Sequence, residues 1–333
     1  MTVNFFRRLL FPLALLCVLL DATTVAPSAL AAPASYPTRP IRIIDPFPPG
    51  GATDFVDRIV AAKLSERFGQ PVIVDNRPGA GGNLSAEIAA RATPDGYTVH
   101  MNLPGGMAAG RALFPQLAYD ISKDFAYVTL VAAGTYVLVS HSTVPAKSIS
   151  ELVALARSKP DQLRFGSAGV ASPPHLALEL FKLRTATRML HVPYKGAGPL
   201  VAGLLGGEVQ LGFVSPAGAS ASVKAGRLKA LAVSSSKRAK SLPSVATVAE
   251  SGYPDFDVTP WYGYMAPAGT PKHIVKLLNA EIGKILEMPD VRAAFLTQGL
   301  EATRSTPERM RQVMEEELVR WTRVIKEANI TAK

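Results

Sequence analysis

Cysteine is almost absent from this sequence, which has one, Cys17, in 333 residues. Cys17 lies in an apolar N-terminal segment, and cleavage after Ala31 would leave the mature chain without cysteine. Such a chain forms no disulfide and holds no thiolate-bound metal. The five histidines are far apart, and no two of them have the spacing of a metal-binding pair. The sequence therefore predicts no metal site.

Long apolar runs are also scarce. The run at 9–20 follows Arg7 and Arg8, is interrupted by Pro12, and is too short to span a bilayer, which needs about 20 residues. Small residues then lead to Ala-Leu-Ala at 29–31. A basic start, a short apolar run and an Ala-x-Ala site are typical of a secretory signal peptide. We expect residues 1–31 to be removed on export, the alternative being an uncleaved anchor.

Acidic side chains are fewer than basic ones, with 26 Asp and Glu against 36 Lys and Arg, a net charge of +10. The basic residues are scattered, and the densest run, 237–240, has no interleaved aromatic residues. Scattered charge favours a solvated surface over a nucleic-acid patch. The surplus is compatible with an anionic solute but does not identify one. We therefore expect no nucleic-acid partner.

What the sequence does contain is a repeated unit of strand, glycine-rich turn and helix. Apolar and β-branched segments predict strands at 41–44, 71–74, 97–101, 136–140, 163–166, 189–192, 209–214 and 228–233. Helical periodicity or proline starts predict helices that include 55–68, 83–91, 148–156, 271–286, 290–298 and 307–328, with Asn83, Ser85 and Ser148 as capping residues. This alternation predicts parallel strands whose loops meet at the carboxyl ends.

Two of the turns are unusually rich in glycine: Pro-Pro-Gly-Gly at 48–51 and Pro-Gly-Ala-Gly-Gly at 78–82. Each precedes a predicted helix, where backbone N–H groups are unpaired and the helix dipole favours an anion. Two such turns at neighbouring strand ends predict two sets of amide donors facing one crevice. The alternative is that the glycines only permit tight turns.

Signatures of enzymes are weak. The segment 79–84 has Leu84 where a dinucleotide fingerprint needs a small residue, and the next strand ends at Asn102 where an acidic residue would hold a ribose. The turn at 166–169 lacks the spacing of a hydrolase nucleophile elbow. His175 suits a hydrogen-bonding role at a helix start. We expect no catalytic residues and no cofactor; an exported hydrolase assembled from dispersed residues stays an alternative.

Several segments together resemble one family. The segments at 46–54, 76–83 and 94–98 resemble the Bug family, the substrate-binding receptors of tripartite tricarboxylate transporters. Further matches are 165–167 with Ser172 and His175, 193–196, 205–209, 261–263 and 266–271. They occur in order over essentially the whole mature chain.

The resemblance implies an α/β fold with two Rossmann-like lobes of the periplasmic-binding-protein type, two crossing strands and a ligand cleft between the lobes. It assigns 36–133 plus 258–333 to the first lobe and 134–257 to the second. It also implies that backbone amides and ordered water grip a carboxylate. The ligand-binding residues carried over are Phe47, Pro49, Gly50, Asp54, Ala80, Gly81, Gly82, Asn83, Ser167, Ser172, His175 and Tyr194.

The sequence departs from the family pattern at two places. Residues 213–216 are neutral, where many relatives carry an acidic residue. Asn102 is followed by Leu-Pro-Gly-Gly at 103–106, where relatives commonly have a small residue and histidine. Both segments lie where the identity of the ligand could be set, so they leave the particular acid open.

The resulting expectation is a monomeric periplasmic receptor that binds no metal or cofactor. It would close on a small carboxylate, either a dicarboxylate or an aromatic carboxylate, and deliver it to the membrane permease subunits of a tripartite tricarboxylate transporter. The alternative partner is a sensor kinase of a two-component system, which would read the same closed form.

Overall fold

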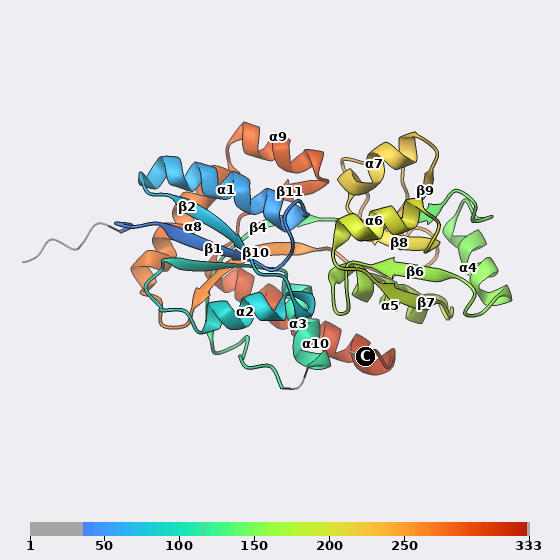
Figure 1. Cartoon of the computed structure of the whole chain (residues 1–333), viewed down its shortest axis with the longest axis horizontal. Helices are drawn as coiled ribbons and strands as arrows, with labels where there is room; N and C mark the ends of the chain where they lie inside the picture. Colours follow the sequence, from blue (N-terminus) through green and yellow to red (C-terminus); the bar gives the residue numbers. More distant parts are fainter. Residues whose placement is uncertain (1–35, 115, 332–333) are drawn as a thin grey trace, which may run out of the picture. The chain divides into compact units, whose positions relative to one another are not determined.

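The computed structural model describes residues 36–114 and 116–331. The expected signal peptide and Cys17 lie outside these residues. Within the described ranges, no helix has both the length and the apolar character needed to cross a bilayer. Residues 37–333 contain two sheets, each accompanied by its own helices (Figure 1).

The first sheet has six strands in the order β11-β4-β10-β3-β1-β2. Their bounds are β1 (Ile41–Asp45), β2 (Val72–Asn76), β3 (Thr98–Asn102), β4 (Phe125–Gly134), β10 (Trp261–Pro267) and β11 (Leu300–Ala302). Strands β1, β2 and β3 are parallel, as the sequence predicted, whereas β10 runs antiparallel to both β3 and β4. The carboxyl ends of the parallel strands therefore meet at one edge.

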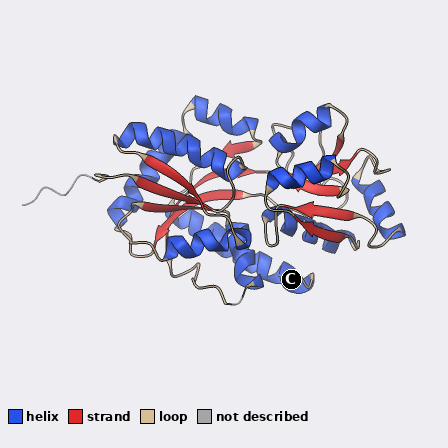
Figure 2. Ribbon diagram, viewed as in Figure 1, coloured by secondary structure: helices blue, strands red, loops and turns tan. Residues whose placement is uncertain are grey.

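The helices that accompany this sheet are α1 (Ala52–Phe68), α2 (Asn83–Ala90), α3 (Pro104–Leu113), α8 (Lys272–Leu286), α9 (Pro289–Thr297) and α10 (Pro307–Glu327). Figure 2 shows helices on both sides of the strands. On one side, Met310 and Met314 of α10 share an apolar cluster with Ile44, Ala86 and Leu130. Burial on both faces explains why four of the five residues in each of β1 and β3 are buried.

The second sheet has five strands in the order β7-β6-β8-β5-β9. Its strands are β5 (Val137–His141), β6 (Arg164–Ser167), β7 (Leu190–Pro193), β8 (Leu211–Val214) and β9 (Leu228–Val233), and its helices are α4 (Ile149–Ser158), α5 (Pro173–Thr185), α6 (Ala197–Leu205) and α7 (Pro216–Lys224). Strand β6 pairs parallel to β7 and β8, and β5 pairs antiparallel to β8 and β9. The predicted cap of α4 is confirmed, because the Ser148 hydroxyl accepts a hydrogen bond from the Glu151 N–H at 3.2 Å.

The other predicted caps are wrong. The N-cap of α2 is Gly82, which has no side chain, and Asn83 and Ser85 are the first and third residues of the helix. The Asn83 amide donates backwards to the Ala80 carbonyl at 2.5 Å, and the Ser85 hydroxyl donates to the Gly82 carbonyl at 2.7 Å. The preceding turn, a short 3-10 helix over Ala80–Gly82, places these side chains against carbonyls rather than against free N–H groups.

The chain crosses between the sheets twice, after β4 and before β10. The two crossing segments are hydrogen-bonded to each other: the Gly134 N–H donates to the Pro260 carbonyl at 3.0 Å, and the Tyr136 N–H donates to the Ser234 hydroxyl at 2.9 Å. Helix α10 also joins both lobes, since Trp321 and Val324 belong to the apolar cluster of the second sheet. The residue limits of the lobes given above remain a prediction.

Candidate functional site

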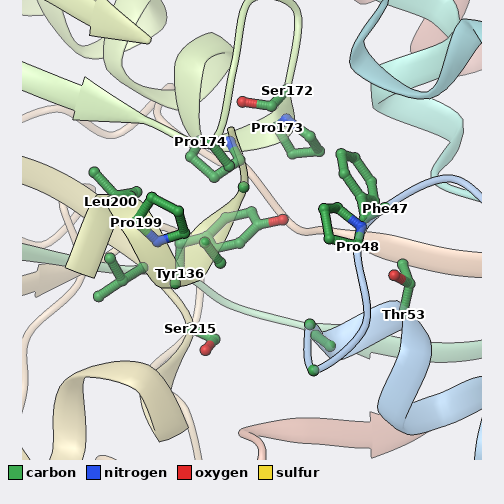
Figure 3. A pocket seen from close by; sticks show the side chains of 18 of the residues that line it. Phe47, Pro48, Thr53, Tyr136, Ser172, Pro173, Pro174, Pro199, Leu200 and Ser215 are labelled. Atoms are coloured by element: carbon green, nitrogen blue, oxygen red, sulfur yellow. The ribbon is translucent and has the colours of Figure 1, made fainter. Parts of the chain in front are cut away.

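A cavity of about 220 Å³ lies between the two lobes (Figure 3). It is bordered by residues of the first lobe at 47–53, 103 and 262, and by residues at 136, 168, 172–174, 195–200 and 213–215. Most of these positions follow the carboxyl ends of strands or lie at the starts of α1, α5, α6 and α7, whereas Tyr136 and Tyr262 lie near the amino ends of β5 and β10. In doubly wound α/β proteins, ligands bind at this edge of the sheet.

The start of α1 supplies unpaired amides to this cavity. Gly51, its N-cap, has extended backbone and no side chain, and Ala52 and Thr53 are the first two helical residues. Within the described part of the chain, the N–H groups of all three make no hydrogen bond, and all three residues border the cavity. Amides at a helix N-terminus form an anion site because the dipole adds a partial positive charge.

Asp54 holds the loop that precedes these amides. Its Oδ2 accepts from the Gly50 N–H at 3.0 Å and from Arg58 Nε at 2.9 Å, and its Oδ1 accepts from Asn76 Nδ2 at 3.1 Å. Burial raises the pKa of Asp54, but the hydrogen bonds from Arg58, Gly50 and Asn76 outweigh it, so the pKa lies below its ordinary value. Asp54 is therefore ionised at neutral pH. Of these residues, only Gly50 borders the cavity.

The second glycine turn is arranged differently from the first. The Gly82 N–H donates to the Gly79 carbonyl at 2.9 Å, and the Asn83 N–H donates to the Ala80 carbonyl. Gly81 and Gly82 do not border the main cavity. With Phe47 they line a separate space of about 10 Å³. Two N–H groups that were predicted to face a ligand, those of Gly82 and Asn83, are therefore bonded to carbonyl groups of the turn itself.

Two residues that line this space each have a buried polar atom without a hydrogen-bond partner among the described residues, Nδ1 of His100 and Oδ1 of Asn102. The volume of the space is close to that needed for one water molecule. The other polar atoms of these side chains are satisfied: His100 Nε2 is 3.0 Å from the Ser85 hydroxyl, and Asn102 Nδ2 donates to the Gly263 carbonyl at 2.9 Å. Burial lowers the pKa of His100 to about 3, so its ring is neutral.

In the second lobe, one of the predicted binding residues borders the cavity. Ser172 is the N-cap of α5, and its hydroxyl donates to the Gly169 carbonyl at 2.6 Å. The Ser167 hydroxyl is 2.6 Å from His191 Nε2 and donates to the same Gly169 carbonyl at 3.0 Å. The Tyr194 hydroxyl donates to Glu208 at 2.9 Å. Neither Ser167 nor Tyr194 is among the residues that border the cavity.

His175 is hydrogen-bonded to the loop at 168–172. Its Nδ1 accepts from the Ala171 N–H at 3.2 Å, and its ring stacks on that of His191 with centroids 4.1 Å apart. Burial, followed by the charges on His191 and Lys182, lowers the pKa of His175 to about 3. A neutral ring that accepts a backbone hydrogen bond holds the loop at 168–172 in place, which agrees with the hydrogen-bonding role expected at this helix start.

The predicted site residues thus fall into two groups. Phe47, Pro49, Gly50 and Ser172 border the main cavity. The others are not among the residues that border it: Asp54, Ala80, Gly81, Gly82, Asn83, Ser167, His175 and Tyr194. Their role as ligand contacts remains a prediction.

Sequence reasoning did not select several residues of the cavity wall. Tyr136 lies on the first crossing segment, Tyr262 near the start of β10, and Phe213 near the end of β8. Burial raises the pKa of both tyrosines, so both are neutral. Tyr262 and Lys195 lie in two segments, 261–263 and 193–196, that resemble the family. The second of these segments was a signal from which Lys195 could have been predicted as a cavity residue. Tyr136 has no local signal, because only the path of the chain brings it to the cavity.

The chemistry of the cavity favours binding of an anion. Lys195 is the one cationic side chain among its lining residues, and none of them is acidic. Prolines, Leu200 and Phe213 give it apolar walls. The hydrogen-bonded Ser167 and His191 lie outside it, so no nucleophile with a base faces the cavity. Among the described residues, no cluster of His, Cys, Asp or Glu could hold a metal ion.

Two α/β lobes with a cavity at their strand ends define the chain as a two-lobe binding protein of the periplasmic type. Residues 56–330 match the sequence model of a protein family described as the tripartite tricarboxylate transporter family receptor. The chain belongs to this family. It is therefore a solute-binding receptor and not an enzyme. It is 38% identical to Protein BugT of Bordetella pertussis over 313 residues, which are 93% of this chain and 96% of that protein.

Two solved structures show the same fold with a ligand. R. palustris Rpa4515 with adipate is 34% identical, with a TM-score of 0.84 over 89% of this chain and 99% of that one. MatC (Rpa3494) from Rhodopseudomonas palustris with bound malate is also 34% identical, with a TM-score of 0.81 over 87% of this chain and 100% of that one. The predicted fold class and family are confirmed.

Proposed function

We propose that this receptor captures a small carboxylate, a dicarboxylate or an aromatic carboxylate, between its lobes. We further propose that it works in the periplasm and passes the carboxylate to the membrane permease subunits of a tripartite tricarboxylate transporter. The observation that carries the first proposal is the set of unpaired N–H groups of Gly51, Ala52 and Thr53 at the cavity wall. These amides bind a carboxylate oxygen without a charged side chain beneath it.

The rest of the cavity supports the same class of ligand. Lys195 adds positive charge at the rim, where its side chain is exposed. The apolar walls suit the carbon skeleton of an organic acid and disfavour a sugar, which needs many hydrogen-bond partners. The absence of acidic lining residues disfavours a cationic amine. That two similar proteins were solved with adipate and malate is in agreement with this choice.

Capture requires the lobes to move relative to each other. The proposed mechanism is closure about the two crossing segments, which are single connections bonded to each other through Gly134 and Pro260 and through Tyr136 and Ser234. Closure would surround the anion and remove it from water, and this strengthens its bonds to the amides. The closed form would then be the one that the permease recognises.

A thermal-shift screen of organic acids tests the proposal. The panel contains malate, succinate, adipate and benzoate, with glucose and putrescine as controls. A ligand that binds the folded state raises the unfolding temperature by mass action. We expect at least one acid to raise it and neither control to do so. A panel in which glucose or putrescine stabilises the protein and no acid does would overturn the proposed ligand class.

A further inference from the structure

Two aspartates lie completely buried beneath the loop that carries the amides. Asp45 is the last residue of β1, and Asp57 lies in the second turn of α1; both side chains have 0% exposure. The receptor function described above uses neither of them. Buried carboxylates are costly unless each oxygen is satisfied or one group is neutral.

Their hydrogen bonds account for only half of their oxygens. Asp45 Oδ1 accepts from the Phe47 N–H at 2.7 Å and from the Thr53 hydroxyl at 3.2 Å. Asp57 Oδ1 accepts from the Tyr264 hydroxyl at 2.6 Å. Oδ2 of both aspartates is buried and has no donor among the described residues.

The two carboxyl groups also contact each other. A carboxylate has no hydrogen to donate, so two ionised groups in contact repel each other and leave both Oδ2 atoms unsatisfied. One proton held between the two groups would turn the contact into a hydrogen bond and remove the repulsion. Burial raises the pKa of Asp45 to about 6 and raises that of Asp57 well above its ordinary value. The contact between the two groups lowers the pKa of Asp45 and raises that of Asp57, which favours Asp57 as the member that holds the proton.

The surrounding groups leave this assignment unchanged. On α1, Asp54 repels the pair and Arg58 attracts it, and on β10 the neutral Tyr262 and Tyr264 face it. On β2 the residue paired with Asp45 is the uncharged Asn76. On β3 the nearest titratable group is His100, paired with Ile44, and its ring is neutral. At the far end of α1, Arg67 is engaged by Glu281 of α8.

Asp45 also binds both ends of the loop at 46–53. The Phe47 N–H lies at the start of that loop, and Thr53 lies at its end, next to the unpaired amides of Gly51 and Ala52. An ionised acceptor that binds two donors makes stronger hydrogen bonds than a neutral one. The position of the loop therefore depends on an ionised Asp45, although its side chain is buried. A proton on Asp57 makes this possible because a neutral Asp57 does not repel the Asp45 carboxylate and can donate a hydrogen bond to it.

We propose that Asp45 and Asp57 share one proton and together position the loop at 46–53, with Asp57 as the donor and Asp45 as the acceptor that holds both loop ends. Both are positioning residues, since neither borders the cavity. The consequence for ligand affinity rests on the proposed function, whereas the shared proton and the loop contact do not.

The first test measures the proton directly in the protein without ligand. Carboxyl carbons of ¹³C-labelled aspartate are followed by NMR between pH 4 and pH 9, with Asp45→Asn and Asp57→Asn to assign the signals. We expect the signal that is missing in Asp57→Asn to stay in the protonated form at pH 7, and the one missing in Asp45→Asn to be ionised. Two ionised signals at pH 7 would overturn the proposal.

The second test asks whether the pair positions the loop. In Asp57→Asn the side-chain amide can still donate to Asp45, so hydrogen exchange of the Phe47 amide should stay at the wild-type rate. Asp57→Leu lacks the donor and should exchange that amide at least tenfold faster, with unchanged exchange in α8. Asp75→Asn, which removes a carboxylate from β2 but not from the pair, is the control. Equal Phe47 exchange in Asp57→Asn and Asp57→Leu would contradict the positioning role.

The third test links the pair to binding, with the best acid from the panel as the probe. On the alkaline side, where Asp57 loses its proton, wild-type affinity should fall, while Asp57→Asn should keep its affinity because an amide does not titrate. Identical pH profiles of the two proteins would exclude the link to binding. If no acid of the panel binds, the proposed function fails, and the first two tests still decide whether the proton is shared.

Discussion

Gly81 of the first lobe faces the backbone of Val170 in the second so closely that a β-carbon on Gly81 would stand 2.9 Å from the Val170 carbonyl oxygen. Gly81 also has a left-handed backbone, with φ 66° and ψ 19°. The second glycine turn therefore serves the approach of the two lobes, besides any contact with a ligand. Only glycine meets both demands at this position.

Gly81→Ala should weaken ligand binding by at least tenfold, because the added methyl group obstructs the closed arrangement. The matched control is Gly69→Ala. Gly69 has almost the same backbone, φ 62° and ψ 16°, but open space where the methyl group would stand. Both variants should lose about 1 kcal/mol of unfolding free energy from the left-handed backbone. Calorimetric titration should then show reduced ligand affinity for Gly81→Ala but not for Gly69→Ala. An equal loss of ligand affinity in both variants would contradict the prediction.

Ala52→Pro should remove one amide of the proposed anion site without disturbing α1. Proline is tolerated at the first helical position, and the preceding Gly51 already has the extended backbone that proline requires, with φ −81° and ψ 175°. We expect the unfolding temperature without ligand to stay within a few degrees of wild type and the ligand-induced shift to be strongly reduced. Lys272→Pro, at the same position of α8, should leave the ligand-induced shift unchanged.

Ser215→Asp should weaken anion binding while it preserves the fold. Ser215 borders the cavity and caps α7, since its hydroxyl accepts from the Gly218 N–H at 3.2 Å. Aspartate is an equally good cap, so the helix start is kept while a negative charge enters the cavity wall. We expect the Kd for an acid to rise at least tenfold, with a smaller effect at high salt. Ser148→Asp makes the same exchange at the cap of α4 and should bind like wild type.

His175 should make the protein less stable as the pH falls. Burial lowers the pKa of His175 to about 3 in the folded chain, against an ordinary value of 6.5. Below pH 6.5 the unfolded chain takes up a proton that the folded chain does not. The contribution of the neutral His175 to the free energy of unfolding is therefore fully present above pH 6.5 and is lost progressively as the pH falls from 6.5 to 3. The loss from pH 7 to 5 is about 2 kcal/mol for this one group.

His175→Gln should flatten that part of the stability curve, because glutamine keeps an acceptor for the Ala171 N–H and does not titrate. Urea unfolding at pH 7 and pH 5 measures the difference. Asp45 acts in the opposite direction, since its raised pKa costs stability as the pH rises from 4 to 6. The comparison therefore has to be made between wild type and variant at each pH, and a variant that loses as much stability as wild type would refute the assignment.

The alternation of strand, glycine turn and helix was sufficient to predict the parallel strands β1, β2 and β3, because each segment carries its own local signal. Strand β4 was not predicted. Its segment, Phe125–Gly134, is followed almost directly by β5 with no strong turn signal between Gly134 and Val137. The chain passes from one sheet to the other there, and no local pattern marks such a crossing.

The sequence by itself determined the strand and helix content of the glycine-rich segments, the family, and the free amides at the start of α1, since an extended glycine before a helix leaves those N–H groups unpaired. Only the tertiary structure decided that the second glycine turn packs against Val170, that Tyr136 reaches the cavity, and that Asp45 contacts Asp57. The physical reason is distance along the chain. Backbone geometry is set by neighbours in sequence, whereas burial, pKa and cavity walls depend on segments that meet only after folding.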